Sequence, residues 1–367
     1  MKILYVTTIG LTMIFFKDFV KDLIDEGHTV DIACNENEYK VDDCYQKMGC
    51  KIYQIECSRS PFNGGNFKAI TQLRKIVCDG QYDIVHCHTP IAGVCTRLAC
   101  KKLRKTGVKV FYTAHGFHFY KGAPLKNWLI FYPIEKFCSR FTDTLITINS
   151  EDYELAKKKM KAKCIEYVPG VGVDVDKFKN AVVDKAAKRR ELGIPENAFL
   201  LLSVGELNEN KNHQIVIHEL VQLRNSNIHY LIAGEGPLHD DLIKLSEDLD
   251  VKQQVHVVGF RNDVEQLYKT ADVNVFPSIR EGFGLAAIEG MAAGLPLICS
   301  DNRGTREFAE DGVNAIVCKT IDDYKDAISR LCADQNVILK LKENGIIRAQ
   351  QFSTDYINQL MLKVYFD

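Results

Sequence analysis

Short apolar runs alternate with longer amphipathic stretches along most of the chain. In the first half we expect buried strands at residues 2–8, 29–34, 51–55, 83–87, 108–113, 144–148 and 164–168. The alternation resumes with expected strands at residues 199–204, 229–233, 255–258 and 272–276. Strands that alternate with helices predict parallel sheets covered by helices on both faces.

The alternation breaks at Pro169–Asp174, which is the best linker candidate. We therefore expect an α/β protein of two doubly wound, Rossmann-like domains, residues 1–170 and 171–349, that face each other across a cleft lined by the loops after the strands. A dinucleotide-binding domain would carry Gly-x-Gly-x-x-Gly after its first strand. Only Gly10 is present there, which argues against a nicotinamide cofactor.

The stretch from Phe276 to Ser300 carries the clearest chemistry. Its strand should end before Pro277, and a glycine-bearing loop then opens an Ala-rich helix that should stop at Gly294. Such a helix start is an anion site. Glu281 and Glu289 bracket this site, and carboxylates accept hydrogen bonds from hydroxyls. The pattern suggests a nucleotide sugar, although two solvated glutamates in an ordinary strand–loop–helix would read the same way.

Glu281 and Glu289, separated by seven residues, with Gly-Phe-Gly-Leu after the first, resemble the donor-site signature of family 4 retaining glycosyltransferases, which have the GT-B fold. The resemblance implies that Glu281 reaches the donor sugar and Glu289 the ribose hydroxyls. It also implies that loop amides hold the diphosphate, at Gly282, Phe283, Gly284 and Leu285. Transfer in this fold is described as front-face substitution, so no enzyme nucleophile is assigned.

Two further segments of the second domain resemble the family's donor site. Lys211 and Asn212 follow an expected strand, and Lys211 matches a lysine that neutralises the diphosphate. Glu206 stands where the family usually has arginine, so it bonds a donor hydroxyl or only orients Lys211. The family holds the base just after the Gly259 position, where Phe260 or Arg261 could stack on it; a surface turn is the alternative.

The first domain contributes two histidine clusters, at residues 86–88 and 115–118. By resemblance, His115 lies beside the donor sugar and acts in catalysis, His88 contacts the acceptor, and Gly10 contacts the donor. A His-x-His with a nearby cysteine also raises a zinc reading. Neighbouring strand residues point to opposite faces and no second ligand pair is evident, so we expect no metal.

Composition adds three points. The 13 cysteines are scattered without a Cys-x-x-Cys pair, which predicts free thiols in a reducing cytosol. Residues 1–180 carry a net charge of +7 and residues 181–367 carry −8. The stretch 117–137 mixes aromatic and basic residues, so it either lies on an anionic membrane surface or packs in the core. No run approaches the roughly 20 apolar residues of a membrane span.

We therefore expect a retaining glycosyltransferase of the bacterial capsule or exopolysaccharide type. Its donor would be a UDP-sugar carrying a hexose or N-acetylhexosamine, and its acceptor a lipid-diphosphate-linked saccharide. We expect no cofactor and no nucleic-acid partner. We expect a cytoplasmic protein, either soluble or bound peripherally at the inner face of the plasma membrane. By resemblance, a helix at about residues 350–367 returns to the first, acceptor-binding domain. A UDP-sugar 2-epimerase of the same fold and a non-catalytic nucleotide-sugar sensor are the alternatives.

Overall fold

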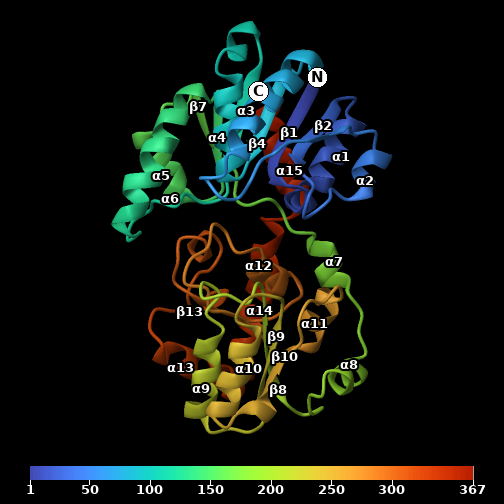
Figure 1. Ribbon diagram of the computed structural model, residues 1–367. Helices are drawn as coiled ribbons and strands as arrows, with labels where there is room; N and C mark the ends of the chain where they lie inside the picture. The colour runs from blue at the N-terminus through green and yellow to red at the C-terminus, as the bar shows by residue number, and fades with distance from the viewer. Residues whose placement is uncertain (367) are drawn as a thin grey trace. The chain divides into compact units, whose positions relative to one another are not determined.

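The computed structural model describes residues 1–366, which form two compact α/β units (Figure 1). The first unit comprises residues 1–171 together with the segment from Ile357 onward, and the second comprises residues 172–356. The helix expected at about residues 350–367 corresponds to α15 (Thr354–Phe366), which joins the first unit from Ile357. Each unit contains one parallel sheet with helices on both faces.

The sheet of the first unit has seven parallel strands in the order β3-β2-β1-β4-β5-β6-β7. The strands are β1 (Lys2–Ile9), β2 (Thr29–Asn35), β3 (Ile52–Gln54), β4 (Ile84–His88), β5 (Lys109–Ala114), β6 (Thr144–Thr147) and β7 (Cys164–Tyr167). The order reverses between β1 and β4. The loops after these two strands therefore diverge and leave a crevice at the carboxyl edge of the sheet, where ligands bind in open α/β folds.

The helices of the first unit cover both faces of this sheet. They are η1 (Gly10–Phe16), α1 (Lys17–Asp25), α2 (Asp43–Lys47), α3 (Gly65–Gly80), α4 (Pro90–Cys100), η2 (Leu103–Thr106), α5 (Leu125–Cys138), η3 (Ser139–Phe141), α6 (Ser150–Lys159) and α15 (Thr354–Phe366). Helices α3 to α6 pack on one face, and η1, α1, α2 and α15 pack on the other. The segment between β1 and β2 begins as the 3₁₀ helix η1 and continues directly into α1.

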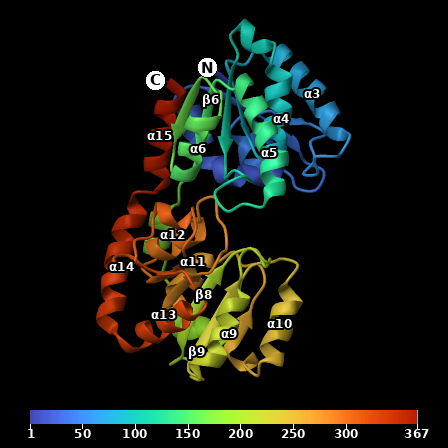
Figure 2. The ribbon, with the colours of Figure 1, turned by 90° about the vertical axis from the view of Figure 1, so that its left-hand side faces the viewer.

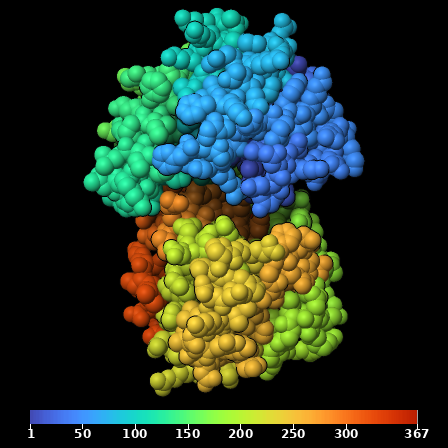
Figure 3. All heavy atoms as spheres, viewed as in Figure 1, coloured from blue at the N-terminus to red at the C-terminus, as the bar shows by residue number. Residues whose placement is uncertain are grey.

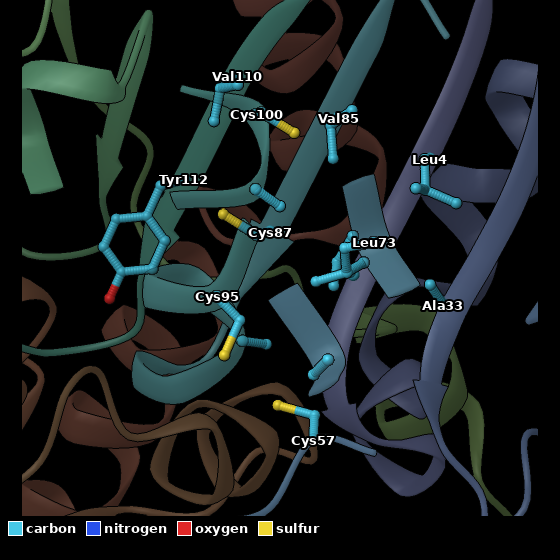
Figure 4. Close-up of a cluster of buried hydrophobic side chains, with 14 of the residues drawn as sticks. Leu4, Ala33, Cys57, Leu73, Val85, Cys87, Cys95, Cys100, Val110 and Tyr112 are labelled. Atoms are coloured by element: carbon cyan, nitrogen blue, oxygen red, sulfur yellow. The ribbon is translucent and has the colours of Figure 1, made fainter. Parts of the chain in front are cut away.

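Cysteines form part of the core between the sheet and α3 and α4. Figure 4 shows Cys87 of β4 beside Cys95 and Cys100 of α4, with Leu4 and Leu73 in the same cluster. A buried thiol packs like a small apolar side chain. All 13 cysteines carry free thiols, as the sequence analysis expected.

The second unit has a six-stranded parallel sheet in the order β10-β9-β8-β11-β12-β13. Its strands are β8 (Phe199–Val204), β9 (Ile228–Ala233), β10 (Val255–Val257), β11 (Val273–Phe276), β12 (Leu297–Ser300) and β13 (Ala315–Cys318). The order reverses between β8 and β11. The loops after β8 and β11 thus border the crevice of this sheet.

Helices again cover both faces of the second sheet. They are α7 (Val175–Asn180), α8 (Lys185–Glu191), α9 (Gln214–Leu223), α10 (His239–Asp248), η4 (Lys252–Gln254), α11 (Val264–Thr270), α12 (Leu285–Ala292), η5 (Thr305–Glu307), α13 (Asp322–Ala333) and α14 (Gln335–Gln350). Figure 2 shows α9 and α10 on one side of the strands and α11 and α12 on the other. Within residues 1–366, no helix has both the length and the apolar character needed to cross a bilayer.

Candidate functional site

The residues with the strongest sequence signal meet at the strand-order reversal of the second unit. Lys211 comes from the loop after β8, and Glu281 comes from the loop after β11. The Lys211 Nζ atom lies 2.6 Å from Glu281 Oε1, and the two side chains are only 20% and 14% exposed. A charged pair at the switch point of a doubly wound sheet is where a polar ligand is expected.

Two hydrogen bonds to backbone carbonyl groups fix the two loops to each other. The Asn210 side-chain amide donates to the Arg280 carbonyl at 2.8 Å, and the Ile279 N–H donates to the Asn210 carbonyl at 2.8 Å. Asn212 adopts a positive φ of 55°, which asparagine tolerates better than most residues. This geometry holds Lys211 against the Glu281 loop before any ligand arrives.

Helix α12 begins where the sequence predicted, directly after Gly284. Gly284 has a φ of 115°, which favours glycine, and no side chain caps the helix N-terminus. The first-turn amides and the helix dipole therefore form an anion site. The Phe283 ring is buried against Phe308 and Phe352 and so anchors the loop. The expected contact of the loop amides with the diphosphate stays a prediction.

Glu289 lies one turn into α12, in a setting unusual for a carboxylate. Desolvation by burial raises its pKa to about 7. The Tyr268 hydroxyl donates to the Ala286 carbonyl at 2.7 Å and lies 3.3 Å from Glu289 Oε2, and Lys177 and Lys211 oppose the rise of the pKa. A carboxylate kept this costly to ionise is a candidate ligand-binding group.

The loop after β12 also belongs to this site, although no sequence motif indicated it. Arg303 is buried, and its Nε lies 3.3 Å from the Glu281 carbonyl oxygen. A Cβ on Gly304 would stand 2.5 Å from the Phe283 carbonyl oxygen and 2.7 Å from Glu281 Cβ. The polar run Asp301–Gly304, directly after a strand, was the signal that could have found it.

A glycine follows each of the neighbouring strands β8, β9 and β10, at Gly205, Gly234 and Gly259. A Cβ on Gly234 would lie 1.9 Å from the Gly205 carbonyl oxygen, so the two loops approach as closely as backbones can. The next residue after Gly205, Glu206, is exposed, and the partner of Lys211 is Glu281 instead. Lys211 thus pairs with Glu281 and not with Glu206.

The loop after β10 contains the two candidates for contact with a base. Phe260 is 65% exposed. Arg261 pairs with Asp263 and with Glu191 of α8, each at 2.6 Å. The Arg261 guanidinium is therefore engaged within the protein, whereas the Phe260 ring is accessible. We keep Phe260 as the candidate for stacking on a base.

The predicted residues of the first unit gather at its own strand-order reversal. His88 ends β4 and His115 follows β5, and their rings share a hydrogen bond of 3.1 Å between His88 Nδ1 and His115 Nε2. Burial lowers the pKa of His115 to about 4 and that of His88 well below its usual value. Gly10 is buried, and a Cβ there would lie 2.4 Å from the Tyr39 carbonyl oxygen, so close packing requires glycine.

Successive side chains of β4 point to opposite faces of the sheet, so Cys87 is separated from the histidines that suggested a zinc site. His86 bonds to Thr113 at 2.8 Å and to Tyr365, whereas Cys87 packs in the core beneath α4 on the other face. Within residues 1–366, no three His, Cys, Asp or Glu side chains are grouped closely enough to hold a metal ion. The His88–His115 pair is therefore a hydrogen-bonding site formed by two neutral imidazoles.

We expect His115 to give no titration near pH 6.5 in the pH dependence of activity. Its pKa of about 4 keeps the ring neutral above roughly pH 5. His115→Gln should lower kcat at every pH from 5.5 to 9 by a similar factor. A loss that appears only on one side of pH 6.5 would instead assign His115 a change of protonation in this range.

Comparison with known proteins identifies the family. Residues 184–348 match the model of glycosyl transferases group 1, and residues 2–149 match that of the glycosyl transferase 4-like domain. The chain is 40% identical to EpsD of Bacillus subtilis strain 168, a protein assigned as a glycosyltransferase, over 85% of this chain and 84% of EpsD.

A second relative is the UDP-Gal:α-D-GlcNAc-diphosphoundecaprenol α-1,3-galactosyltransferase of Escherichia coli, 30% identical over 77% of this chain and 75% of the enzyme. The crystal structure of Anabaena HepE in complex with UDP-glucose shares the fold, with a TM-score of 0.82 and 20% identity over 100% of this chain and 99% of HepE. The chain belongs to the family 4 glycosyltransferases and has their GT-B fold.

Proposed function

We propose that the protein transfers a hexose or N-acetylhexosamine from a UDP-sugar to a lipid-diphosphate-linked saccharide, with retention at the anomeric carbon. One observation carries this proposal. Lys211 and Glu281 pair at 2.6 Å beside the uncapped N-terminus of α12, with Glu289 one turn further on. A cation, helix amides and two carboxylates suit a ligand with a diphosphate between two hydroxylated rings.

The pair has to open when the donor binds. In the proposed complex, Lys211 turns to the diphosphate together with the first-turn amides of α12. Glu281 is then free to accept hydrogen bonds from hydroxyls of the transferred sugar, and Glu289 accepts them from the ribose. As the bond to the anomeric carbon breaks, negative charge grows on the leaving phosphate, where Lys211 and the helix dipole stabilise it.

The proposed UDP-sugar donor and lipid-diphosphate-linked acceptor are supported by the names of relatives. The E. coli relative is named for a UDP-Gal donor, an α-linked product and a diphosphoundecaprenol-linked acceptor. EpsD, at 40% identity, is the stronger match but its name specifies no sugar. We extend the donor class and the acceptor class to this chain, and leave the sugar itself to the assay.

The test is incubation of the purified protein with UDP-glucose, UDP-galactose and their N-acetylated forms, with and without a diphosphate-linked saccharide. Transfer requires released UDP and a longer saccharide, and the anomeric proton coupling of the product reports its configuration. UDP release without a longer saccharide would contradict the proposal, and so would formation of a C2 epimer. Binding without turnover of any donor would point to the sensor alternative.

Activity should persist in excess EDTA. The proposed charge neutralisation comes from Lys211 and α12, so no divalent ion is required at the diphosphate. Initial rates with and without EDTA, each repeated after addition of Mn²⁺ or Mg²⁺, check this. Complete loss in EDTA with recovery on adding either ion would mean that a metal is required.

Helix α5 supports a membrane-facing role for the first unit. The sequence left two alternatives for this stretch, packing in the core or lying on a membrane surface. One side of α5 packs in the core through Trp128 and Phe131, while the opposite side is exposed. That exposed side carries Leu125, Leu129, Ile130, Ile134 and Phe137, which are 43% to 73% exposed. Lys126 and Arg140 are exposed at its two ends, and α5 forms an outer edge of its unit (Figure 3).

An apolar helix face bordered by bases suits the interface of an anionic bilayer. We therefore expect the protein to float with vesicles of phosphatidylglycerol and phosphatidylcholine at low salt, and less at high salt. Leu129→Gln with Ile134→Gln should reduce binding at least tenfold, because each buried aliphatic side chain contributes about 1.5–3 kcal/mol. Ile347→Gln, at a residue of α14 that is 65% exposed, is the matched control. Equal flotation of both variants would remove α5 from the interface.

A further inference from the structure

The first unit contains an open hollow whose lining includes none of the site residues described above. It lies at the carboxyl ends of β1, β2 and β3 and has a volume of about 360 Å³. The loop after β2 contributes Asn37 and Glu38, and the loop after β3 contributes Glu56, Ser58 and Arg59. This edge adjoins the strand-order reversal between β1 and β4, where His88 lies.

The lining combines groups that recognise hydroxyls with one guanidinium. Amides and carboxylates accept and donate the hydrogen bonds that sugar hydroxyls make. Arg59 is exposed and forms no ion pair or side-chain hydrogen bond within residues 1–366, although Glu38 and Glu56 line the same hollow. Glu56 instead pairs with Lys68 at 3.1 Å. The Arg59 fork is thus available for an external anion, and phosphate matches its geometry.

One buried asparagine holds the Arg59 loop on both sides of Arg59. The Ser58 N–H donates to Asn66 Oδ1 at 2.9 Å, and the Asn66 side-chain amide donates to the Ser60 carbonyl at 2.9 Å. Asn66 is 8% exposed and sits in the first turn of α3. Its two bonds fix the backbone that carries Arg59, so a ligand would meet a loop that is already ordered.

A second clamp joins the two loops of the hollow. The Asn35 side-chain amide donates to the Cys57 carbonyl at 2.8 Å, and Asn35 Oδ1 accepts from the Asn37 N–H at 3.0 Å. These bonds keep the polar side chains of the β2 loop facing those of the β3 loop. Because carboxylates disfavour a nearby phosphate and accept hydrogen bonds from hydroxyls, we assign the anion to Arg59 and the hydroxyls to Glu38.

We infer that this hollow binds the acceptor, with a phosphate of its diphosphate on Arg59 and the attached sugar against Asn37 and Glu38. This inference rests on the proposed function, because it assumes a diphosphate-linked saccharide acceptor. Phe62, at the tip of the same loop and 94% exposed, provides an apolar surface next to Arg59 for the start of the lipid chain. Asn66 acts as a positioning residue through the Arg59 loop.

The test is calorimetric titration of the full chain with N-acetylglucosamine joined through a diphosphate to a geranyl chain. The comparison ligand is the geranyl glycoside of the same sugar, which lacks the diphosphate. Arg59→Ala should weaken binding of the first ligand tenfold or more and leave the glycoside unchanged. Arg59→Lys should keep part of the affinity, and Asn66→Ala should lose several-fold by loosening the loop. Lys75→Ala removes one exposed charge elsewhere on α3 and should change neither.

The outcomes separate this inference from the proposed function. Unchanged affinity in Arg59→Ala, an equal loss for both ligands, or no binding of the diphosphate ligand by the natural chain would each overturn the assignment of the hollow. UDP affinity, measured on every variant, should be unaffected by substitutions at Arg59 and Asn66. Failure of the natural chain to bind UDP would instead refute the donor site of the second unit.

Discussion

Lys211→Ala should lower kcat/KM at least 100-fold, which corresponds to about 2.7 kcal/mol of transition-state stabilisation. In the proposed complex, Lys211 neutralises a diphosphate whose charge increases as the glycosidic bond breaks, so its contribution is larger in the transition state than in the ground state. The substitution also leaves Glu281, only 14% exposed, without its 2.6 Å partner. An unpaired carboxylate next to a phosphate would add to the loss.

Binding experiments separate these two effects of Lys211. Lys211→Ala should weaken UDP binding strongly and uridine binding little, because uridine has no phosphate. Lys211→Ala combined with Glu281→Gln should bind UDP better than Lys211→Ala alone, since the uncompensated carboxylate is gone. Lys244→Ala, at an exposed position of α10, is the control for loss of one positive charge. Equal weakening of UDP and uridine would assign Lys211 to loop structure instead.

Local sequence signals predicted the main elements of this fold. Glycines and prolines at the strand ends placed the β11 loop and the start of α12 at Leu285, because few other residues fit those backbone angles. Short elements were missed: α2 has five residues, and no periodic pattern can form over that length. Helices α13 and α14 were not predicted either, because no glycine or proline signal as strong as that of α12 precedes them.

The candidate site was predictable where one loop carried it and obscure where contacts crossed the sheet. Glu281 and Glu289 lie in one motif, so their spacing together with the flanking Gly-Phe-Gly-Leu could find them. The bond from Arg303 to the Glu281 loop joins residues 22 positions apart and depends on how β12 packs beside β11. The burial of the Phe283 ring depends on such contacts too, because the ring packs against Phe308 and Phe352, which lie outside the motif.

Glu289→Gln should change ligand binding and stability in opposite directions. The Glu289 carboxylate is proposed to accept hydrogen bonds from ribose hydroxyls, and a charged hydrogen bond contributes about 1.5–3 kcal/mol, so UDP affinity should fall about tenfold or more. Burial, however, raises the pKa of Glu289 in the folded protein to about 7, from 4.5 in the unfolded chain. Ionisation of Glu289 therefore costs stability, and glutamine removes that cost.

The pH dependence gives this prediction its sign. Below about pH 4.5, Glu289 is protonated in both the folded and the unfolded chain, so the substitution should alter the melting temperature little. Between pH 4.5 and 7, the unfolded chain ionises while the folded protein retains the proton, and the natural chain progressively loses up to about 3 kcal/mol relative to Glu289→Gln. The advantage of the variant should then stay constant above pH 7.

UDP affinity provides the second, independent readout of Glu289. A protonated carboxyl group is a poorer acceptor than a carboxylate, so UDP binding by the natural chain should weaken as the pH falls from 8 to 6. Glu289→Gln should be weak throughout and lack this dependence. Glu343→Gln, at an exposed position of α14, serves as the control for removal of a carboxylate. A Glu289→Gln variant that melts lower than the natural chain at pH 8, or binds UDP equally well, would show that Glu289 serves the fold of α12 and not the donor.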